Sequence, residues 1–132
     1  MKTNLDGLFK TDESIEKQGV WYELAPGVAF LIKRFGGYNS PTIKSALAKY
    51  YKPYAKQIEN GTLDQSKEKE IMNKVFVEAC IVDWKGIVIN GENAQFSVDA
   101  CVKLMGSLPE MADILIAHAS DFKNYKEDLG NF

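Results

Sequence analysis

The sequence VWYEL (residues 20–24), followed by APG (25–27) and VAFLIKR (28–34), decides the fold of this chain. β-Branched and aromatic side chains favour strands, and a Pro-Gly pair favours a turn between them, so the stretch predicts a β-hairpin. Val20, Tyr22 and Leu24 fall on one side of the first strand and Trp21 on the other, whereas the second strand is apolar on both sides. A two-stranded unit does not easily cover both of its faces. We therefore expect one face or strand edge to pair with a second copy of the chain or with a partner segment.

After FGG (residues 35–37) the apolar period changes from that of a strand to that of a helix. Ser40 can cap a helix that has Pro41 in its first turn. An apolar residue then recurs every three or four positions, at Ile43, Leu47, Tyr50, Tyr54 and Ile58. This spacing predicts a helix over about residues 41–58. Pro53 lacks a backbone N–H and crowds the preceding turn, so we expect a kink or break there that leaves two shorter helical pieces.

A second helix is predicted after the stop signal Asn60-Gly61. Thr62 or Asp64 can cap it, and its apolar stripes reach about Asp83. Between residues 84 and 96 the helical period stops, and two glycines bracket a short apolar run. This segment predicts a short strand pair or an ordered loop.

Two more helices are predicted near the C-terminus. Ser97 begins one that ends at Gly106, and Pro109 opens the last, whose apolar stripe continues to Leu129. Together with the hairpin, these segments predict an α+β fold. In it an N-terminal β-hairpin packs against about four α-helices in a single compact domain.

Residues 1–18 mix charged side chains with a few scattered apolar ones, so we expect a mobile N-terminal arm there and a single domain over residues 19–132. Of the 132 residues, 45% are hydrophobic and 26% charged, as in an ordinary soluble domain. The N-terminus lacks the apolar core of a signal peptide, and no apolar run is long enough to cross a bilayer. We therefore expect a cytoplasmic protein that binds no membrane.

Residues that usually carry catalysis or bind metals are sparse. A single histidine, His118, excludes HExxH and any two-histidine site, and the chain lacks the GxSxG, GxxxxGK[ST] and GxGxxG patterns. Cys80 and Cys101 do not form a CxxC pair, so they fit neither a zinc cluster nor a disulfide framework. We expect a protein that is not an enzyme and that needs no metal or other cofactor. His118 follows the apolar stripe of the last helix and is expected in the core or an interface.

Charge is unevenly distributed along a chain whose formal net charge is −2. Residues 33–58 hold six basic side chains and no acidic one. Four of them form a predicted basic patch on the first long helix: Lys44, Lys49, Lys52 and Lys56. Such a patch can contact phosphates, face an acidic protein surface, or be solvated opposite a tyrosine-rich apolar face. Because the chain has no recognisable nucleic-acid-reading module, we do not expect nucleic acid as its partner.

Large aromatic side chains are the other candidates for a binding role. Tryptophans beside glycine turns usually fill a core, but tryptophan and tyrosine also supply much of the binding energy at protein interfaces. The predicted partner-binding residues are Trp21, Tyr22, Phe30, Tyr50, Tyr54 and Trp84.

A series of short motifs resembles the tail assembly chaperones of long-tailed (siphovirus-type) bacteriophages. Each motif is ordinary hairpin, cap or turn chemistry, and the resemblance lies in their order and spacing over residues 19–122. The motifs are GVWY (19–22), IKR (32–34), GG (36–37), Asn39, YKPY (51–54), GTLD (61–64), WKGI (84–87), FS (96–97) and LP (108–109). The segments before residue 19 and after residue 122 match least.

The resemblance implies a non-enzymatic protein that binds the tape measure protein in the cytoplasm of the infected bacterium, keeps it soluble and assists polymerisation of the tail tube. The tail tube protein is then a further partner, self-association is expected, and the chaperone is absent from the mature virion. Because a tape measure chain is long and helical, the expected contact is an amphipathic helix in an apolar groove. Two alternatives stay open, namely a structural tail or neck subunit that remains in the virion and a small nucleic-acid-binding regulator.

Overall fold

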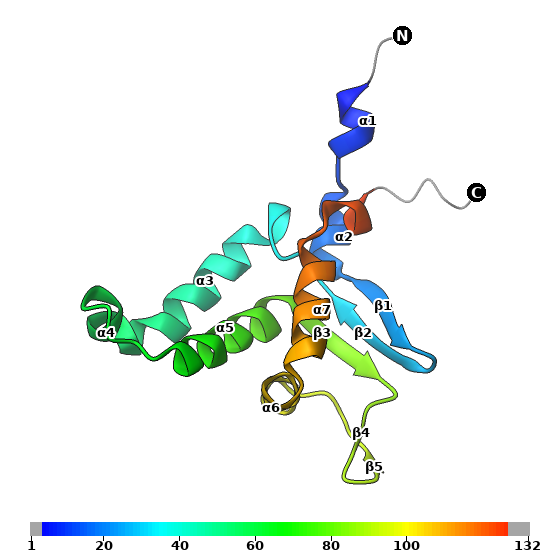
Figure 1. Ribbon diagram of the computed structural model, residues 1–132. Coiled ribbons are helices and arrows are strands. Elements are labelled where there is room, and N and C mark those ends of the chain that lie inside the picture. Colours follow the sequence, from blue (N-terminus) through cyan, green and yellow to red (C-terminus); the bar gives the residue numbers. More distant parts are fainter. Residues whose placement is uncertain (1–3, 127–132) are drawn as a thin grey trace.

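A three-stranded antiparallel sheet forms one end of the molecule (Figure 1). The computed structural model describes residues 4–126. The strand order is β1 (Val20–Ala25), β2 (Val28–Ile32) and β3 (Ile81–Lys85), so β2 is the central strand. The predicted α+β class and the predicted hairpin of β1 and β2 are both confirmed.

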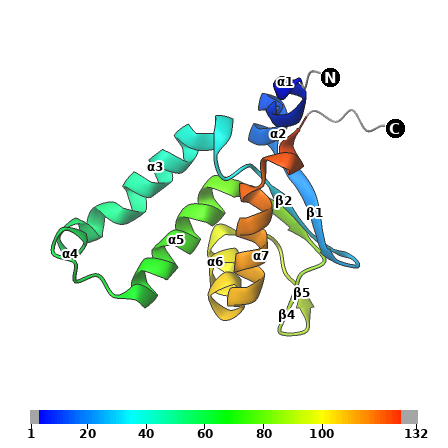
Figure 2. The same ribbon diagram turned by 45° about the horizontal axis from the view of Figure 1, so that its top comes forward.

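The helices divide into an arm and a stack. Helices α3, α4 and α5 form an arm that extends away from the sheet, whereas α6 and α7 lie beside the end of α5 that is nearer to the sheet (Figures 1 and 2). The bounds of the helices are α1 (Leu5–Phe9), α2 (Glu13–Gln18), α3 (Ser40–Tyr51), α4 (Ala55–Glu59), α5 (Gln65–Cys80), α6 (Val98–Ser107) and α7 (Pro109–Ser120). As the sequence predicts, residues 84–96 include a short strand pair, β4 (Val88–Ile89) and β5 (Glu92–Asn93).

The core lies between one face of the sheet and helices α5, α6 and α7. Phe30 of β2 is completely buried and meets the edge of Trp84 on β3, with ring centroids 6.1 Å apart. Leu115 of α7 is also fully buried. The hydroxyl of buried Tyr125 donates to the carbonyl of Ile32 at 3.1 Å, which attaches the segment after α7 to the central strand.

Pro53 breaks the first long helix, as predicted. Helix α3 ends at Tyr51, a 3-10 turn spans Lys52–Tyr54, and α4 continues over Ala55–Glu59. The missing N–H of proline and its clash with the preceding turn account for this break. Of the two helical pieces, α3 packs along α5, and α4 continues the chain beyond the break.

The predicted helix caps are confirmed at two positions and wrong at a third. The side chains of Asp64 and Ser97 accept hydrogen bonds from N–H groups in the first turns of α5 and α6, at 3.5 and 3.1 Å. Ser40 instead lies inside α3, and Asn39 precedes the helix. The amide of Asn39 donates to the carbonyls of Arg34 and Ala79, so it joins the segment after β2 to α5 rather than capping α3.

The second predicted helix ends at Cys80 and not near Asp83. Ile81–Lys85 forms strand β3, and its pairing with β2 sets Trp84 opposite Phe30. Without β3 the second edge of β2 would leave backbone groups unpaired beside the core, which is costly. The helical period of the sequence could not reveal this, because the partner strand lies about 50 residues earlier in the chain.

The last helix is also shorter than predicted. Helix α7 ends at Ser120, and a separate 3-10 turn covers Phe122–Tyr125. The backbone of Asp121 is extended, and its side chain accepts a hydrogen bond from the N–H of Lys123 at 3.0 Å, so this residue stops one element and caps the next. The predicted stripe ended at Leu129, which lies outside the described residues.

Residues 5–18 form two short helices, of which α2 belongs to the packed unit. The carboxylate of Glu16 on α2 is 0% exposed and accepts hydrogen bonds from Arg34 and from the N–H of Tyr38. Burial alone would raise the pKa of Glu16, but hydrogen bonds from Thr11, Tyr38 and Arg34 outweigh burial and hold this pKa below its ordinary value. The boundary predicted at residue 19 is therefore wrong for α2, whereas α1 projects from the body (Figure 1). Residues 1–3 lie outside the described part.

Candidate functional site

One face of the sheet carries exposed side chains, and we call it the outer sheet face. Paired residues share a face, and neighbouring residues of a strand alternate. Two rows of paired residues cross the three strands on this face. The first row is Trp21, Leu31 and Asp83. The second row is Glu23, Ala29 and Lys85. These six residues define the outer sheet face, on the side opposite Phe30 and Trp84. Trp21 is 39% exposed there.

A shallow hollow lies on the outer sheet face. Its volume is about 320 Å³, and Trp21, Glu23, Gly27, Val28, Ala29 and Lys85 line it. The ammonium of Lys85 stands 4.0 Å from the centre of the Trp21 ring, a cation–π arrangement. The hollow thus joins an aromatic ring, of the kind that is enriched at protein interfaces, with a cation and a carboxylate on one surface.

A glycine allows β3 to approach the hairpin turn closely. A Cβ atom at Gly86 would lie 1.9 Å from the carbonyl oxygen of Gly27, and the φ of Gly86 is +73°. Any side chain there would collide with the backbone of the turn. Gly86 therefore allows Lys85 to sit beside Trp21 at the end of the sheet.

Two of the predicted partner-binding residues are core residues instead. Phe30 is 0% and Trp84 is 5% exposed. The indole N–H of Trp84 donates to the carbonyl of Ala94 at 2.8 Å, and its ring meets the edge of Phe96. The prediction of a binding role is wrong for both, because β3 pairs with β2 and brings the two rings together on the face that the helices cover.

Tyr22 lies half-buried on the covered face and stacks on His118 of α7, with ring centroids 4.1 Å apart. The sequence predicts a core or interface position for His118, and the structure places it half-buried against Tyr22. Its Nδ1 lies 3.3 Å from the amide nitrogen of Asn124, and its Nε2 is buried without a partner among the described residues. Burial lowers the pKa of His118, so the neutral ring is favoured.

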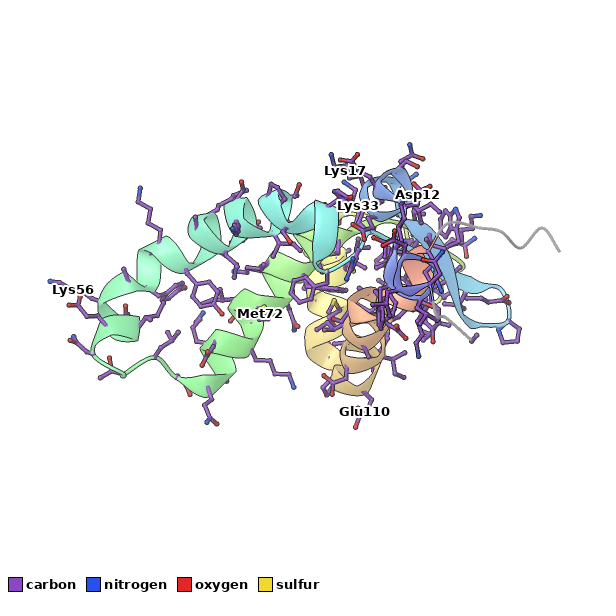
Figure 3. The ribbon with its side chains drawn as sticks, turned by 90° about the horizontal axis from the view of Figure 1, so that it is seen from above. Asp12, Lys17, Lys33, Lys56, Met72 and Glu110 are labelled. Atoms are coloured by element: carbon purple, nitrogen blue, oxygen red, sulfur yellow. The ribbon has the colours of Figure 1, made fainter. Side chains whose placement is uncertain are left out.

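The predicted basic patch is divided and partly neutralised. The ammonium of Lys49 lies 2.7 Å from the carboxylate of Glu78 on α5, and that hydrogen bond raises the pKa of Lys49. Lys44, Lys52 and Lys56 are exposed, but Lys56 lies beyond the break at Pro53, on α4. Figure 3 places Lys56 at the tip of the arm, far from Lys33. The basic run of the sequence therefore does not form one continuous surface.

The two tyrosines predicted to bind a partner lie between the helices of the arm and are half-buried. The hydroxyl of Tyr50 donates to Glu78 at 2.9 Å, the same carboxylate that binds Lys49. Tyr54 lies under the ammonium of Lys67, 5.8 Å from its ring centre. Both rings thus hold α5 against the other side of the arm.

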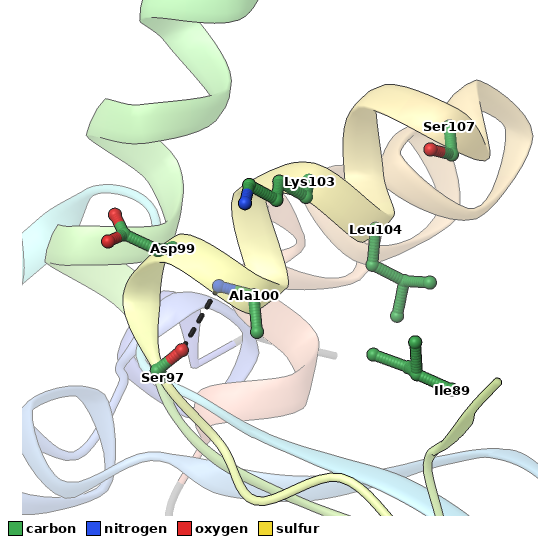
Figure 4. Close-up of a pocket in the computed structure, with 7 residues that line it drawn as sticks. All are labelled: Ile89, Ser97, Asp99, Ala100, Lys103, Leu104 and Ser107. Carbon is green, nitrogen blue, oxygen red and sulfur yellow. Dashed lines mark hydrogen bonds between the residues drawn. The ribbon is translucent and has the colours of Figure 1, made fainter. Parts of the chain in front are cut away.

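A second hollow, larger than the one on the outer sheet face, lies where the β4–β5 hairpin meets α6. The spacing of apolar residues in the sequence did not predict this contact. The volume of this second hollow is about 410 Å³. Figure 4 shows Ile89 and Leu104 pointing toward each other across it, and Ser97 capping the helix at its other end. The lining residues are Ile89, Ser97, Asp99, Ala100, Lys103, Leu104 and Ser107. The sequence predicts the short strand pair of β4 and β5, but it does not show which helix this hairpin contacts.

The cysteine thiols are unreactive. Cys80 and Cys101 are both buried and free of any disulfide, and burial raises the pKa of each to about 12. A thiol with such a pKa is a poor nucleophile because the thiolate is the reactive form. Over residues 4–126, no three His, Cys, Asp or Glu side chains gather in a way that could hold a metal ion.

Comparison with protein families defines the class of protein. The chain is a phage-derived protein. It belongs to the YdaY prophage protein family, whose model matches residues 38–129. The match covers the arm, β3, the β4–β5 hairpin and the stack of α6 and α7, while the hairpin of β1 and β2 precedes it. Comparison with curated proteins and with solved structures gives no match. None of the helices in the described part has the length and apolar character needed to span a membrane.

Proposed function

We propose that this phage protein is a tail assembly chaperone that binds the tape measure protein, keeps it soluble and assists tail tube polymerisation. The observation that carries the proposal is the outer sheet face, where Trp21 stays exposed beside an open strand edge. Prophage membership and the motif series over residues 19–122 support a phage assembly role. In this proposal the protein is not an enzyme, acts in the host cytoplasm and is absent from the virion.

The two edges of the sheet differ in a way that favours β1 as the binding edge. On β3, the carboxylate of Asp83 accepts a hydrogen bond from the N–H of Trp84, and the register with β2 is interrupted between Leu31 and Ile32. Such features disfavour the pairing of a further strand. On β1 the register with β2 is continuous from Val20 to Glu23 and shifts only between Glu23 and Ala25, next to the hairpin turn, and β2 is its only strand partner in the described sheet. We propose that β1 pairs with a client segment or with a second copy.

Co-expression tests the proposal. The tape measure protein of the same prophage is expressed alone, with the wild-type chain, and with the variant Trp21→Glu. We expect the wild type to move the tape measure protein into the soluble fraction and to form oligomers in size-exclusion chromatography with light scattering. We expect Trp21→Glu to lose both effects, because it places a charge on the outer sheet face. Ile114→Glu is the matched control, since Ile114 is similarly exposed but lies on α7.

Three results would contradict the proposal or the surface that carries it. A tape measure protein that stays equally insoluble with the wild-type chain would exclude the chaperone role. Mass spectrometry that detects the chain in purified particles would favour the structural subunit instead. If Trp21→Glu keeps full activity, the outer sheet face is not the binding surface.

A further inference from the structure

Strand β1 forms one edge of the sheet, and β2 is its only strand partner among the described residues. Figures 1 and 2 both show β1 on the outside of the three strands, with helices α3 to α7 on the other side of it. Its side chains alternate between exposed residues on the outer sheet face and half-buried residues on the covered face. The order of these residues favours one particular partner for the edge, namely β1 of a second copy.

Two identical strands can pair antiparallel only in registers that keep each face of the sheet continuous. Because paired residues share a face, each such register is centred on one residue, which lies opposite itself in the second copy. The registers centred on Tyr22 and on Glu23 pair residues 20–24 and 21–25, respectively. Any other register pairs fewer residues of the strand. These two registers are therefore the ones to compare.

Charge distinguishes the two registers. Centring on Glu23 sets its carboxylate directly opposite the same carboxylate of the second copy, and like charges at such positions destabilise a sheet. Centring on Tyr22 instead sets Glu23 opposite Trp21 of the second copy and Val20 opposite Leu24. Apolar residues then meet on the covered face, and no like charges are directly opposite. The strand is thus self-complementary in the register centred on Tyr22.

Lys85 supplies a charge that complements Glu23 in this register. The ammonium of Lys85 stands 4.0 Å from the centre of the Trp21 ring. Glu23 of the second copy lies beside the same ring, on the side of the free edge. Neither Glu23 nor Lys85 forms an ion pair with a described residue of its own chain. The two charges are therefore available to each other, and the symmetry of the pair makes the contact twice.

We propose that β1 pairs antiparallel with β1 of a second copy in the register centred on Tyr22, so that two three-stranded sheets become one continuous sheet. Glu23 of each copy contacts Trp21 and Lys85 of the other. The two outer sheet faces form one surface with both Trp21 rings near its middle. The inference rests on the proposed function only for the client, which binds this joined surface rather than the edge of β1.

Engineered cysteines test the register. Chains with Trp21→Cys or Glu23→Cys are oxidised separately and as an equimolar mixture. The proposed register sets positions 21 and 23 opposite each other at a Cα separation of about 4.5–5.5 Å, which suits a disulfide. We expect a cross-linked dimer only in the mixture, where one native pair of Trp21 and Glu23 remains. Cys80 and Cys101 do not compete, because burial raises the pKa of each thiol to about 12.

The other edge of the sheet provides the matched control. Val82 is 39% exposed, as Trp21 is, but it lies on β3. Val82→Cys should therefore form no cross-link, alone or mixed with either of the other variants. Cross-linking by Val82→Cys at the same yield as the mixture would show random collision and would overturn the inference.

Exchange of charges tests the contact between Glu23 and Lys85. Glu23→Lys should raise the dissociation constant of the dimer about tenfold in analytical ultracentrifugation, because each copy then presents a lysine to Lys85 of the other. Lys85→Glu should have a similar effect. The double variant Glu23→Lys/Lys85→Glu should recover most of the affinity, which a merely misfolded protein cannot do. Glu110→Lys, an equal change of charge at an exposed position of α7, is the control.

The outcomes separate the dimer from the proposed function. Cross-linking of Trp21→Cys alone or of Glu23→Cys alone would show another register and overturn the inference. Loss of the mixed cross-link when the tape measure protein is added would assign the edge of β1 to the client and overturn it as well. A chain that cross-links as expected but leaves the tape measure protein insoluble would support the dimer and exclude the chaperone role. A wild-type chain that solubilises the tape measure protein as a monomer would support the chaperone role and overturn the dimer.

Discussion

The two faces of the sheet carry one tryptophan each. Trp84 on the covered face is 5% exposed, donates its indole N–H to Ala94 and packs edge-on against Phe30. Trp21 on the outer sheet face is 39% exposed, and the ammonium of Lys85 stands 4.0 Å from the centre of its ring. The same residue type therefore contributes to stability on one face and is available to a partner on the other.

The cause of this difference is the placement of the helices. Helices α5, α6 and α7 pack on the face of Phe30, and the third strand extends that face by adding Trp84 to it. Burial of a large side chain contributes about 1.5–3 kcal/mol, so substitutions on the covered face should lower stability and those on the outer sheet face should change binding.

The largest effect on stability is expected from Phe30→Ala. Phe30 is fully buried in the middle of the central strand, and removing such a ring typically costs about 3–5 kcal/mol of unfolding free energy. Urea denaturation followed by circular dichroism measures this loss. A loss below about 1 kcal/mol would show that the covered face is not the core.

The next largest loss of unfolding free energy is expected from Glu16→Gln on helix α2. This change removes a buried charge that binds Arg34 and the N–H of Tyr38, and should cost about 2–3 kcal/mol at neutral pH. The pKa of Glu16 lies below its ordinary value of 4.5, so the stabilisation is present above pH 4.5 and is lost as the pH falls through the folded-state pKa.

Urea titrations at several pH values measure that dependence. The wild type should lose stability more steeply below pH 4.5 than Glu16→Gln does. Parallel curves for the two proteins would show that Glu16 does not anchor α2.

A smaller effect is expected from Trp84→Phe. The phenyl ring keeps most of the packing on the covered face but removes the hydrogen bond to the carbonyl of Ala94. The loss should be about 1–2 kcal/mol. Thermal melting compares this variant with Trp84→Ala, which should be much less stable because it also leaves a cavity.

The smallest effect on stability is expected from Trp21→Ser. Exposed positions usually change the unfolding free energy by no more than about 0.5 kcal/mol. The variant should melt close to the wild type while losing oligomers and tape measure solubilisation. A large drop in melting temperature would show that Trp21 belongs to the core, and the contrast between the two faces would no longer hold.

Local signals in the sequence predicted the elements whose causes are local. Pro53 breaks its helix whatever packs against that helix, and Ser97 caps α6. Residues 25–27 form the turn of the β1–β2 hairpin. Each of these depends on the covalent structure of one residue and its immediate neighbours. The hairpin and the α+β class follow from such signals.

Only long-range pairing explains the elements and roles that the sequence did not predict. Ile81–Lys85 continues an apolar helical stripe, yet it forms a strand because the edge of β2 needs a partner. The run of lysines in residues 33–58 reads as a basic surface, yet Glu78 on α5 neutralises Lys49.

The sequence alone therefore determined which segments form the hairpin, where the first long helix breaks and which histidine and cysteines are internal. The tertiary structure decided that Trp84 and Phe30 are core while Trp21 is exposed. The physical reason is that period and propensity describe a residue and its near neighbours. Exposure and hydrogen-bond satisfaction depend on which distant segment packs against that residue.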